Sequence, residues 1–450
     1  MGGSDIAGDS PKGEGSNSRA SNTNTGNVAR GSGKSELAPA KFPWGAIIAL
    51  AMGMLVYGVA ESYGPVAAIS GVIPSSYAFL GLSLPYVAGG FGALLSGYLT
   101  DAVGRRNSFM LTAAMILAGI IIYVLAGTNV AALVVSFILI GMAAIGLETP
   151  ILSIIAETVP AKWRGNMEVI VQNFGNLGVA IVFIPLLLGF SAAQTEVAIA
   201  LLFLAPLAAL VMGYFMVEET LPWRAATGKA NIDAVNAWKA VDGDAEPVAP
   251  TMSLPLRFLI ITLIGIVQDV AFVYITYDLG FLYFSSSLAS EIPLIGGLIM
   301  VAVGIAFGLA AVHKASRKAV SLASYGALAA LWAVLWAYEA ITRDVASNTL
   351  LFLTALLFIP VETTWGVRAM LEPEMFPTQK RGKYVSYART LVWIIAGTIT
   401  GLLSVYVMSF NAEAAIVMAI FLVGLAMTML WYFKGFETGK KSLVGHDVTQ

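Results

Sequence analysis

Twelve long apolar stretches, separated by short polar breaks, run along the chain from Trp44 to Phe433. A helix needs about 20 consecutive apolar residues to cross the hydrocarbon core of a bilayer, which is about 30 Å thick. The stretches that meet this length lie near residues 44–68, 79–100, 108–127, 130–157, 166–189, 196–217, 257–284, 292–312, 319–341, 348–372, 384–408 and 412–433. Only 12% of the 450 residues are charged, about half the share in a soluble domain. The sequence therefore predicts an all-α integral membrane protein with twelve transmembrane helices.

The composition excludes several other classes of protein. The chain has no cysteine, so it can form no disulfide, thiolate metal site or thiol nucleophile. Its two histidines, His313 and His446, leave little for a histidine metal centre, and a net charge of −2 argues against nucleic-acid binding. No nucleophile–base pair, metal-ligand spacing or phosphate loop is present. We expect a monomer in the lipid bilayer that is not an enzyme and needs no cofactor or metal.

The polar segments divide the chain into parts. Residues 1–42 are rich in Gly, Ser and Asn without an apolar run, which predicts a disordered cytoplasmic tail and no signal peptide. Residues 218–254 form the only long polar segment between spans. The expected parts are a tail (1–42), a six-helix half (43–217), a cytoplasmic linker (218–254), a second six-helix half (255–433) and a second tail (434–450).

The distribution of Lys and Arg predicts the orientation. Alternate loops carry the basic residues, and the opposite loops are almost free of them, with Arg343 as the clear exception. Cytoplasmic loops of membrane proteins are enriched in Lys and Arg. The basic loops contain Arg105 and Arg106, Lys162 and Arg164, Lys314, Arg317 and Lys318, and Lys380, Arg381 and Lys383. We therefore expect a multi-pass protein of the cell membrane with both termini in the cytoplasm.

The two halves repeat each other. Glu157-x-x-Pro-x-x-x-Arg164-Gly recurs at the same spacing as Glu374-x-x-Pro-x-x-x-Arg381-Gly. Glu219-Thr220 after the sixth span matches Glu437-Thr438 after the twelfth, and Arg105-Arg106 has a degenerate counterpart in Arg317-Lys318. Two similar six-span halves are typical of a carrier whose solute site lies between them near the middle of the bilayer.

These segments resemble the major facilitator superfamily, and most closely its sugar porter branch. Gly97-Tyr-Leu-Thr-Asp101-Ala-Val-Gly104-Arg105-Arg106 is similar to the superfamily signature between the second and third helices. Pro160-Ala-Lys-Trp-Arg164-Gly165 followed by Gln172, Glu218-Glu219-Thr220-Leu221-Pro222-Trp223-Arg224 and Phe436-Glu437-Thr438-Gly439-Lys440-Lys441 resemble sugar porter segments. Together they span residues 44–443. The resemblance implies the major facilitator fold of two six-helix pseudo-repeats and transport by alternating access.

Charges at the predicted cytoplasmic helix ends form a candidate gate. We hypothesise that ion pairs there close the cytoplasmic side and break when it opens, and the resemblance implies the same role. The alternative is a set of permanent helix-end charges. The candidates are Asp101, Arg105, Arg106, Glu157, Arg164, Glu374 and Arg381.

A few charges fall inside the membrane. At about 1.5 Å per residue, Asp269 and Glu362 lie roughly 18 Å from the cytoplasmic helix ends, Glu148 roughly 14 Å, and Arg389 roughly 12 Å. Arg368 lies shallower, while Glu61 and Asp278 fall toward the outer end. A charge at a helix centre costs about 2.5–3.5 kcal/mol, so these side chains should face a partner or a polar cavity.

Three deep carboxylates share only two arginines, so at least one lacks an obvious partner. Burial disfavours the charged form of an acid, which makes Glu148, Asp269, Glu362 and, nearer the outer end, Glu61 candidate proton carriers. The alternative is an internal salt-bridge network that joins Asp269 or Glu362 to Arg389 or Arg368.

Polar and aromatic side chains in the spans are candidates for solute binding. Gln172 matches a position that contacts sugar hydroxyls in sugar porters, and an amide both donates and accepts. Further candidates are Asn176, Gln268, Asp269, Trp365, Arg389 and Trp393, with Tyr274 and Tyr277 as additional aromatics. The alternative for the amides is helix–helix hydrogen bonding, and for the aromatics it is packing.

The sequence departs from the sugar porter pattern at several positions. Pro65 and Phe137 stand where proton-coupled members carry an Asp and an Arg, and Glu61 is a conjectural substitute. Arg389 mirrors Gln172 in the second half and suits a carboxylate. We expect a proton-coupled secondary transporter for a sugar-like or polyol-like solute. The close alternative is a transporter of a small organic anion. Uniport or antiport instead of symport stays open, and a non-transporting solute sensor is a more distant alternative.

Overall fold

The computed structural model describes residues 42–74, 77–126, 129–229, 248–312, 314–344, 346–377, 381–406, 408–439 and 441, all within one compact unit, Lys41–Gln450. Within these ranges the secondary structure is helical, and twelve helical segments are long and apolar enough to cross a membrane. The predicted all-α fold with twelve spans is confirmed. Most of the expected tail 1–42, part of the linker 218–254 and most of the tail 434–450 lie outside the described residues, so the domain bounds stay a prediction.

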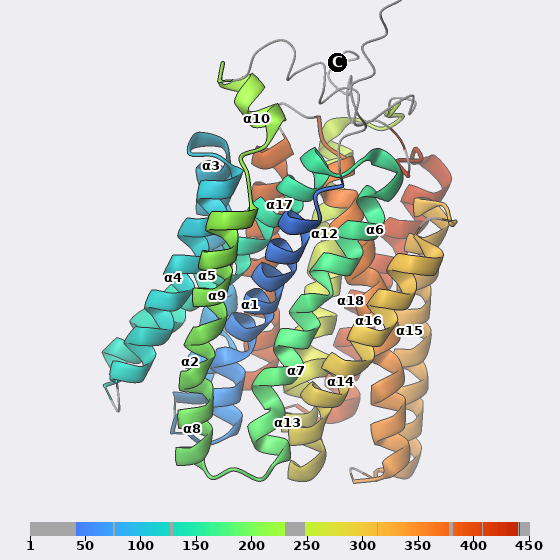
Figure 1. The fold of residues 1–450 in the computed structure, drawn as a ribbon. Helices are drawn as coiled ribbons and strands as arrows, with labels where there is room; N and C mark the ends of the chain where they lie inside the picture. Colours follow the sequence, from blue (N-terminus) through green and yellow to red (C-terminus); the bar gives the residue numbers. More distant parts are fainter. Residues whose placement is uncertain are drawn as a thin grey trace, which may run out of the picture. The chain divides into compact units, whose positions relative to one another are not determined.

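The first six spans run from α1 to α9 (Figure 1). They consist of α1 (Trp44–Ile69), α2 (Ala78–Leu82) with α3 (Leu84–Ala102), α4 (Arg105–Ala126), α5 (Val130–Thr158), α6 (Ala161–Gln172) with α7 (Phe174–Leu187), and α8 (Ala192–Ala200) with η2 (Leu201–Phe203) and α9 (Leu204–Met216). A short helix, α10 (Leu221–Ala226), follows them.

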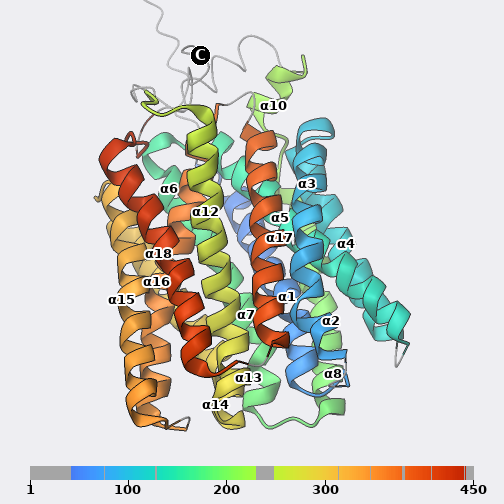
Figure 2. The same ribbon diagram turned by 180° about the vertical axis from the view of Figure 1, so that it is seen from behind.

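The last six spans run from α12 to α18, and Figure 2 shows them from the opposite side. They consist of α12 (Leu254–Val273) with η3 (Tyr274–Asp278) and α13 (Leu279–Tyr283), α14 (Ser286–Ala306) with η4 (Phe307–Ala311), α15 (Arg317–Thr342), α16 (Asn348–Glu374), α17 (Arg381–Val405) and α18 (Phe410–Lys434).

Several helices begin earlier than hydropathy predicts. The span expected at 108–127 begins at Arg105, and the one expected at 384–408 begins at Arg381. Hydropathy detects only the apolar part of a helix, whereas these first turns carry arginines that lie at the end of the bundle. We call this end, which holds Arg105, Arg164, Arg317 and Arg381, the arginine-rich end.

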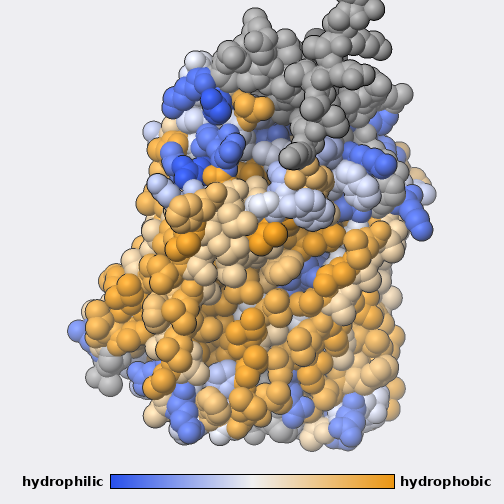
Figure 3. All heavy atoms as spheres, in the orientation of Figure 1, coloured by the Kyte–Doolittle hydropathy of each residue, from blue (hydrophilic) through white to orange (hydrophobic). Residues whose placement is uncertain are grey.

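The surface of the spans is apolar where a bilayer would surround it. Figure 3 shows a hydrophobic band between polar groups at the two ends of the bundle. Large apolar side chains are widely exposed on this surface, among them Leu125 (79%), Phe215 (78%) and Ile341 (82%). An exposed apolar surface of this size marks a lipid interface or a partner interface. The chain is therefore a multi-pass integral membrane protein.

The two most extensive contacts between the first and last six spans are made by two helix pairs. α3 packs against α17, and α7 packs against α14. Small residues and backbone carbonyls make these contacts close: Ser386 Oγ on α17 donates to the Ala93 carbonyl on α3 at 3.0 Å, and Asn173 Nδ2 donates to the Val301 carbonyl on α14 at 2.7 Å. Buried backbone carbonyls thus find partners across this interface.

Two spans of the last six contain a π-helical turn, η3 in the seventh and η4 in the eighth. A π turn inserts one extra residue into a helix and occurs frequently at functional sites. The turn η3 follows directly after the part of α12 that carries Gln268 and Asp269. The fifth span is divided at Asn173, where α6 ends and α7 begins.

Candidate functional site

A small closed cavity lies between the first and the last six spans. Its lining comes from α1 (Tyr57 and Glu61), α12 (Gln268, Asp269 and Phe272), α16 (Trp365) and α17 (Trp393). Each of these side chains belongs to a residue at most 5% exposed, and the cavity offers only about 10 Å³, room for about one water molecule. A cavity of this size cannot hold a sugar, so a solute can bind here only after the lining spans separate.

Aromatic rings form much of the wall of this cavity. The Trp365 ring lies 6.0 Å from that of Tyr57 and 6.4 Å from that of Phe272, and Trp393 stacks on Tyr86 at 5.7 Å. Trp365 and Trp393, two of the residues predicted to bind solute, therefore line the cavity. Their faces are suited to packing against the C–H groups of a small polar ring.

The other two aromatic candidates do not line the cavity. Tyr277 shares a hydrogen bond of 2.9 Å with Ser62 and stacks on Phe183, so it joins α1 to the last six spans. Tyr274 packs edge-on against Trp332 inside the last six spans. The contacts of both tyrosines agree with the alternative that they pack between helices.

The amide candidates have different surroundings. Gln172 is fully buried, and neither its amide nitrogen nor its oxygen has a hydrogen-bond partner in the described part of the chain. Gln268 accepts from Arg368 Nη1 at 2.6 Å. Asn176 donates to Asn173 at 2.8 Å and to Glu362 at 2.5 Å. A buried amide without a partner calls for an explanation, and Gln172 is the one that a solute or water would satisfy.

Two arginines and three carboxylates form a paired network in the middle of the bundle. Arg368 Nη1 lies 2.5 Å from Asp269 Oδ1, and Arg368 Nε lies 2.9 Å from Glu372 Oε1. Arg389 forms an ion pair with Glu148 and a second with Glu372, at 3.2 Å. All five side chains are at most 2% exposed. The pair between Arg389 and Glu148 joins α17 to α5, so it crosses between the two sets of six spans.

This network matches part of the salt-bridge alternative, since Asp269 pairs with Arg368. Glu372, which contacts both arginines, is not among the residues predicted from the sequence. Its position four residues after Arg368 places the two side chains on one helix face, so the spacing carried the signal. The arginine that suits an anionic solute, Arg389, is already held between two carboxylates.

Two predicted proton carriers stand outside the network. Glu362 accepts the bond from Asn176, and its Oε1 has no partner among the described residues. Glu61 forms no ion pair with a described residue, and it lines the same cavity as Asp269 although the sequence placed it toward the outer end. The sequence predicts three deep carboxylates and two arginines. Glu148 and Asp269 each pair with an arginine, and Glu362 pairs with none of the described arginines.

The first arginine-rich network joins α3, α4 and α5. Arg105 forms ion pairs with Glu157 at 3.0 Å and with Asp101 at 3.1 Å. Thr220 Oγ1 donates to Glu157 at 2.5 Å, and Glu219 accepts from the Arg105 backbone nitrogen at 2.9 Å and from that of Arg106 at 3.2 Å. Glu219 thus satisfies two amide groups at the start of α4, where a helix has free N–H groups.

The last six spans repeat this network. Arg317 Nη2 lies 3.2 Å from Glu374, Thr438 Oγ1 donates to Glu374 at 2.5 Å, and Glu437 accepts from the Arg317 backbone nitrogen at 3.1 Å. The candidate gate residues are therefore gathered at one end of the bundle. Glu157 pairs with Arg105 at the start of α4, and Glu374 pairs with Arg317 at the start of α15. Arg164 and Arg381 are buried.

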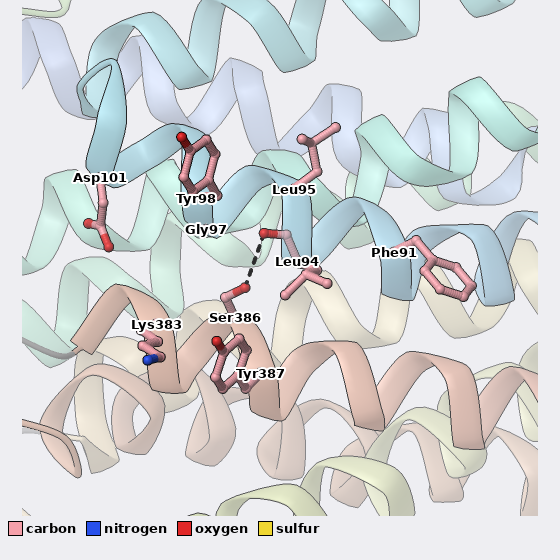
Figure 4. A pocket seen from close by; sticks show the side chains of 9 residues that line it. All are labelled: Phe91, Leu94, Leu95, Gly97, Tyr98, Asp101, Lys383, Ser386 and Tyr387. Atoms are coloured by element: carbon pink, nitrogen blue, oxygen red, sulfur yellow. Dashed lines mark hydrogen bonds between the residues drawn. The ribbon is translucent and has the colours of Figure 1, made fainter.

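A second pocket opens on the outside, between α3 and α17 (Figure 4). It is lined by Phe91, Leu94, Leu95, Gly97, Tyr98, Asp101, Lys383, Ser386 and Tyr387. Figure 4 shows Ser386 bonded to the Leu94 carbonyl across its floor, at 3.4 Å. None of the predicted solute-binding residues lines it, so the central cavity is the candidate solute site.

A twelve-span bundle with a small cavity lined from both sets of six spans, and with a network repeated in each set, is typical of a membrane transporter. The chain belongs to the sugar (and other) transporter family, whose model matches residues 44–448, and so to the major facilitator superfamily. Its relatives are transporters, in agreement with the expectation that the chain is not an enzyme.

Two curated relatives are similar over part of the chain. The glucose transporter GlcP of Staphylococcus epidermidis is 24% identical over 65% of this chain and 70% of its own. The facilitated trehalose transporter Tret1 of Culex quinquefasciatus is 27% identical over 31% of this chain and 28% of its own.

Solved structures share the fold. The proton:xylose symporter XylE, bound to 6-bromo-6-deoxy-D-glucose, has a TM-score of 0.72 at 18% identity and covers 91% of this chain and 99% of its own. The human organic anion transporter MFSD10 has a TM-score of 0.65 at 16% identity, with 86% and 99% covered. Both likenesses concern the arrangement of the helices.

Proposed function

We propose that this protein moves a small neutral polar solute, a sugar or a polyol, across the membrane by alternating access in symport with protons. The observation that carries the proposal is the closed cavity whose wall is shared by α1 of the first six spans and by α12, α16 and α17 of the last six. A cavity built jointly by two sets of spans opens to one side or the other when the sets rock against each other.

The lining favours a solute with several hydroxyl groups. The tryptophans Trp365 and Trp393 offer apolar faces, and Gln268 offers an amide in the cavity wall. The buried amide of Gln172 precedes α7, whose Gly175 lies against Trp365 and Tyr57 of the wall. Sugars present both kinds of surface, because their C–H groups pack on aromatic rings while their hydroxyls bond to amides. The printed descriptions of GlcP and XylE, a glucose transporter and a xylose symporter, agree with this class.

The anion alternative loses its main support. It rested on Arg389 as a partner for a solute carboxylate, but Arg389 is held by Glu148 and Glu372 and does not line the cavity. An anion would have to displace a buried carboxylate from it, and breaking a buried pair leaves an uncompensated charge. A neutral solute needs no such exchange.

The arginine-rich end is proposed to be cytoplasmic, with both chain termini on that side. The basic loops lie there, as the positive-inside rule requires. Asp101, Arg105, Arg106, Glu157, Arg164, Glu374 and Arg381 are proposed to hold this end closed. In support, the Asp101 carboxylate of α3 lies against Gly382 of α17, where an added Cβ would meet its oxygen at 2.7 Å. Rocking of residues 43–217 against 255–433 would separate the two.

Uptake into proteoliposomes tests the proposal. The purified protein is reconstituted with an acidic outer medium and offered radiolabelled glucose, xylose, a polyol and gluconate, each with and without a protonophore. We expect accumulation of at least one neutral solute that falls to equilibrium when the gradient collapses. Accumulation of gluconate alone would favour the anion alternative, and binding without uptake would favour a sensor.

A further inference from the structure

Glu362, like Glu61, has no positive partner among the described residues, but Glu362 also accepts a hydrogen bond from a helix of the other six spans. Glu148 and Asp269 each form an ion pair with an arginine, whereas in the described part of the chain Glu362 accepts from the neutral amide of Asn176, at 2.5 Å. Glu362 is fully buried, and its Oε1 atom has no hydrogen-bond partner in the described part of the chain.

The charged groups on neighbouring helices do not reach it. α16 packs against α5, α6, α12, α14, α15 and α17, while α7, which supplies Asn176, carries no charged residue. The titratable and charged groups on the packed helices are Glu148 and Glu157 on α5, Lys162, Arg164 and Glu168 on α6, Arg257 and Asp269 on α12, Glu291 on α14, Arg317, Lys318, Tyr325, Tyr338 and Glu339 on α15, and Arg381, Lys383, Tyr384, Tyr387 and Arg389 on α17. Oε1 of Glu362 accepts no hydrogen bond from any of those described, nor from Arg368 on α16 itself.

The chemistry of this position suits a neutral acid. An ionised carboxylate buried without a positive partner is far more costly than a neutral one. A protonated acid has one O–H donor and keeps its acceptor capacity, so Oε2 can accept from Asn176 while Oε1 carries the proton. Gly304 of α14 makes room there, because an added Cβ would collide with Oε1 and would lie 2.6 Å from Asn173 Oδ1.

The bond from Asn176 also crosses between the two sets of spans. Asn176 lies on α7 and Glu362 on α16, and Asn173 continues the chain of bonds to the Val301 carbonyl on α14. Three residues after Glu362, Trp365 lines the cavity. Any movement that separates α7 from α14 and α16 breaks this chain of bonds beside the solute site and admits water to the carboxylate.

We infer that Glu362 is the carboxylate that binds the coupled proton, and that the bond between Asn176 and Glu362 links its protonation to closure of the cavity; this inference rests on the proton symport proposed above. In the closed state that holds the solute, the proton is bound to Oε1. When the spans separate, the O–H bond breaks, the proton passes to water as hydronium and the carboxylate stays behind. Closure around the next solute requires that Oε1 take a proton from the water on the other side.

Glu362→Gln tests this inference, because glutamine imitates the neutral acid and cannot release a proton. In proteoliposomes we expect the variant to lose gradient-driven accumulation of the transported sugar, so that inner and outer concentrations stay equal. Solute counterflow without a pH gradient should persist. Glu291→Gln, which alters a carboxylate of α14 outside the site, should keep both activities.

The outcomes separate this inference from the proposed function. Accumulation by Glu362→Gln in response to a pH gradient, in a system where the wild type is proton-driven, overturns the inference alone. Accumulation by the wild type that ignores the gradient overturns the symport and the inference together.

Asn176→Leu keeps the test valid if Glu362→Gln does not fold. This variant retains the carboxylate and removes its donor, so the pH at which counterflow is half-maximal should shift from that of the wild type. A role in packing alone would lower the rate without moving the profile, and an unchanged profile contradicts the inference.

Discussion

Buried arginines and carboxylates are paired in different ways at the arginine-rich end and in the middle of the bundle. At the arginine-rich end the same arrangement occurs twice, with Arg105, Glu157 and Thr220 in the first six spans and Arg317, Glu374 and Thr438 in the last six. Among the described residues in the middle of the bundle the pairing is not repeated: two arginines pair with three carboxylates, and neither Glu362 nor Glu61 forms an ion pair.

The repeated networks at the arginine-rich end are common to both halves, whereas we attribute the unrepeated pairing in the middle of the bundle to transport. A repeated network fixes helix ends in the same way in each half, which a rocking carrier needs. An unrepeated arrangement breaks the symmetry between the halves and places one pairing, between Arg389 and Glu148, across them. Substitutions in the middle should therefore differ in effect from one another, and matched substitutions at the arginine-rich end should agree.

Loss of Arg389 should have the largest effect. Arg389→Gln leaves Glu148 without a positive partner in the middle of the bundle, and breaking a buried pair destabilises by about 3–5 kcal/mol. We expect a large drop in the unfolding temperature in detergent and loss of uptake for neutral and anionic solutes alike. Arg389→Gln combined with Glu148→Gln should recover much of the stability. A single variant as stable as the wild type would contradict the pairing.

Matched loss of the two end arginines should come next. Arg105→Ala and Arg317→Ala each remove contacts with a charged group, which are worth about 1.5–3 kcal/mol, or about a factor of ten or more in an equilibrium. Because the chain has no cysteine, Ser386→Cys provides a single label between α3 and α17. Maleimide labelling of this buried site should accelerate in both variants, and acceleration in only one would break the proposed equivalence of the halves.

Loss of the Gln172 amide should weaken solute binding moderately. A hydrogen bond contributes about 0.5–1.5 kcal/mol, so Gln172→Ala should raise the KM for the transported sugar by up to about tenfold. Gln194→Ala, at the exposed start of α8, is the control and should leave the KM unchanged. An unaltered KM in Gln172→Ala would show that this amide only packs between helices.

The smallest effects should come from the two threonines. Thr220→Val and Thr438→Val remove one hydrogen bond each to Glu157 or Glu374 and keep the side-chain shape. We expect each to lower the free energy of unfolding by about 1 kcal/mol, equally in the two halves. Thermal unfolding of both variants side by side checks this, and clearly unequal losses would contradict the repeat.

The fold was predictable because its signals are local. The hydropathy of each segment predicts its own span, and the repeated segments around Glu157 and Glu374 indicate two related halves. Helix bounds differed where Arg105 and Arg381 extend a helix beyond its apolar part.

For the charges in the middle of the bundle, the sequence predicted how many carboxylates lack an arginine but not which ones. Two arginines for three deep carboxylates implied one left over, but its identity depends on how helices distant in sequence pack. Glu148 meets Arg389 because α5 lies beside α17, and Glu61 of α1 lines a cavity whose other wall residues come from α12, α16 and α17. Neither relation is encoded in the spacing of residues along one helix, whereas that of Arg368 and Glu372 is.

The most direct test of symport is to follow protons and solute together. Proteoliposomes containing the wild type and a trapped pH-sensitive dye are given the transported sugar outside, with no initial pH gradient. The account predicts that sugar entry acidifies the interior, and that the protonophore abolishes the signal. Sugar entry with no change in internal pH would contradict proton symport.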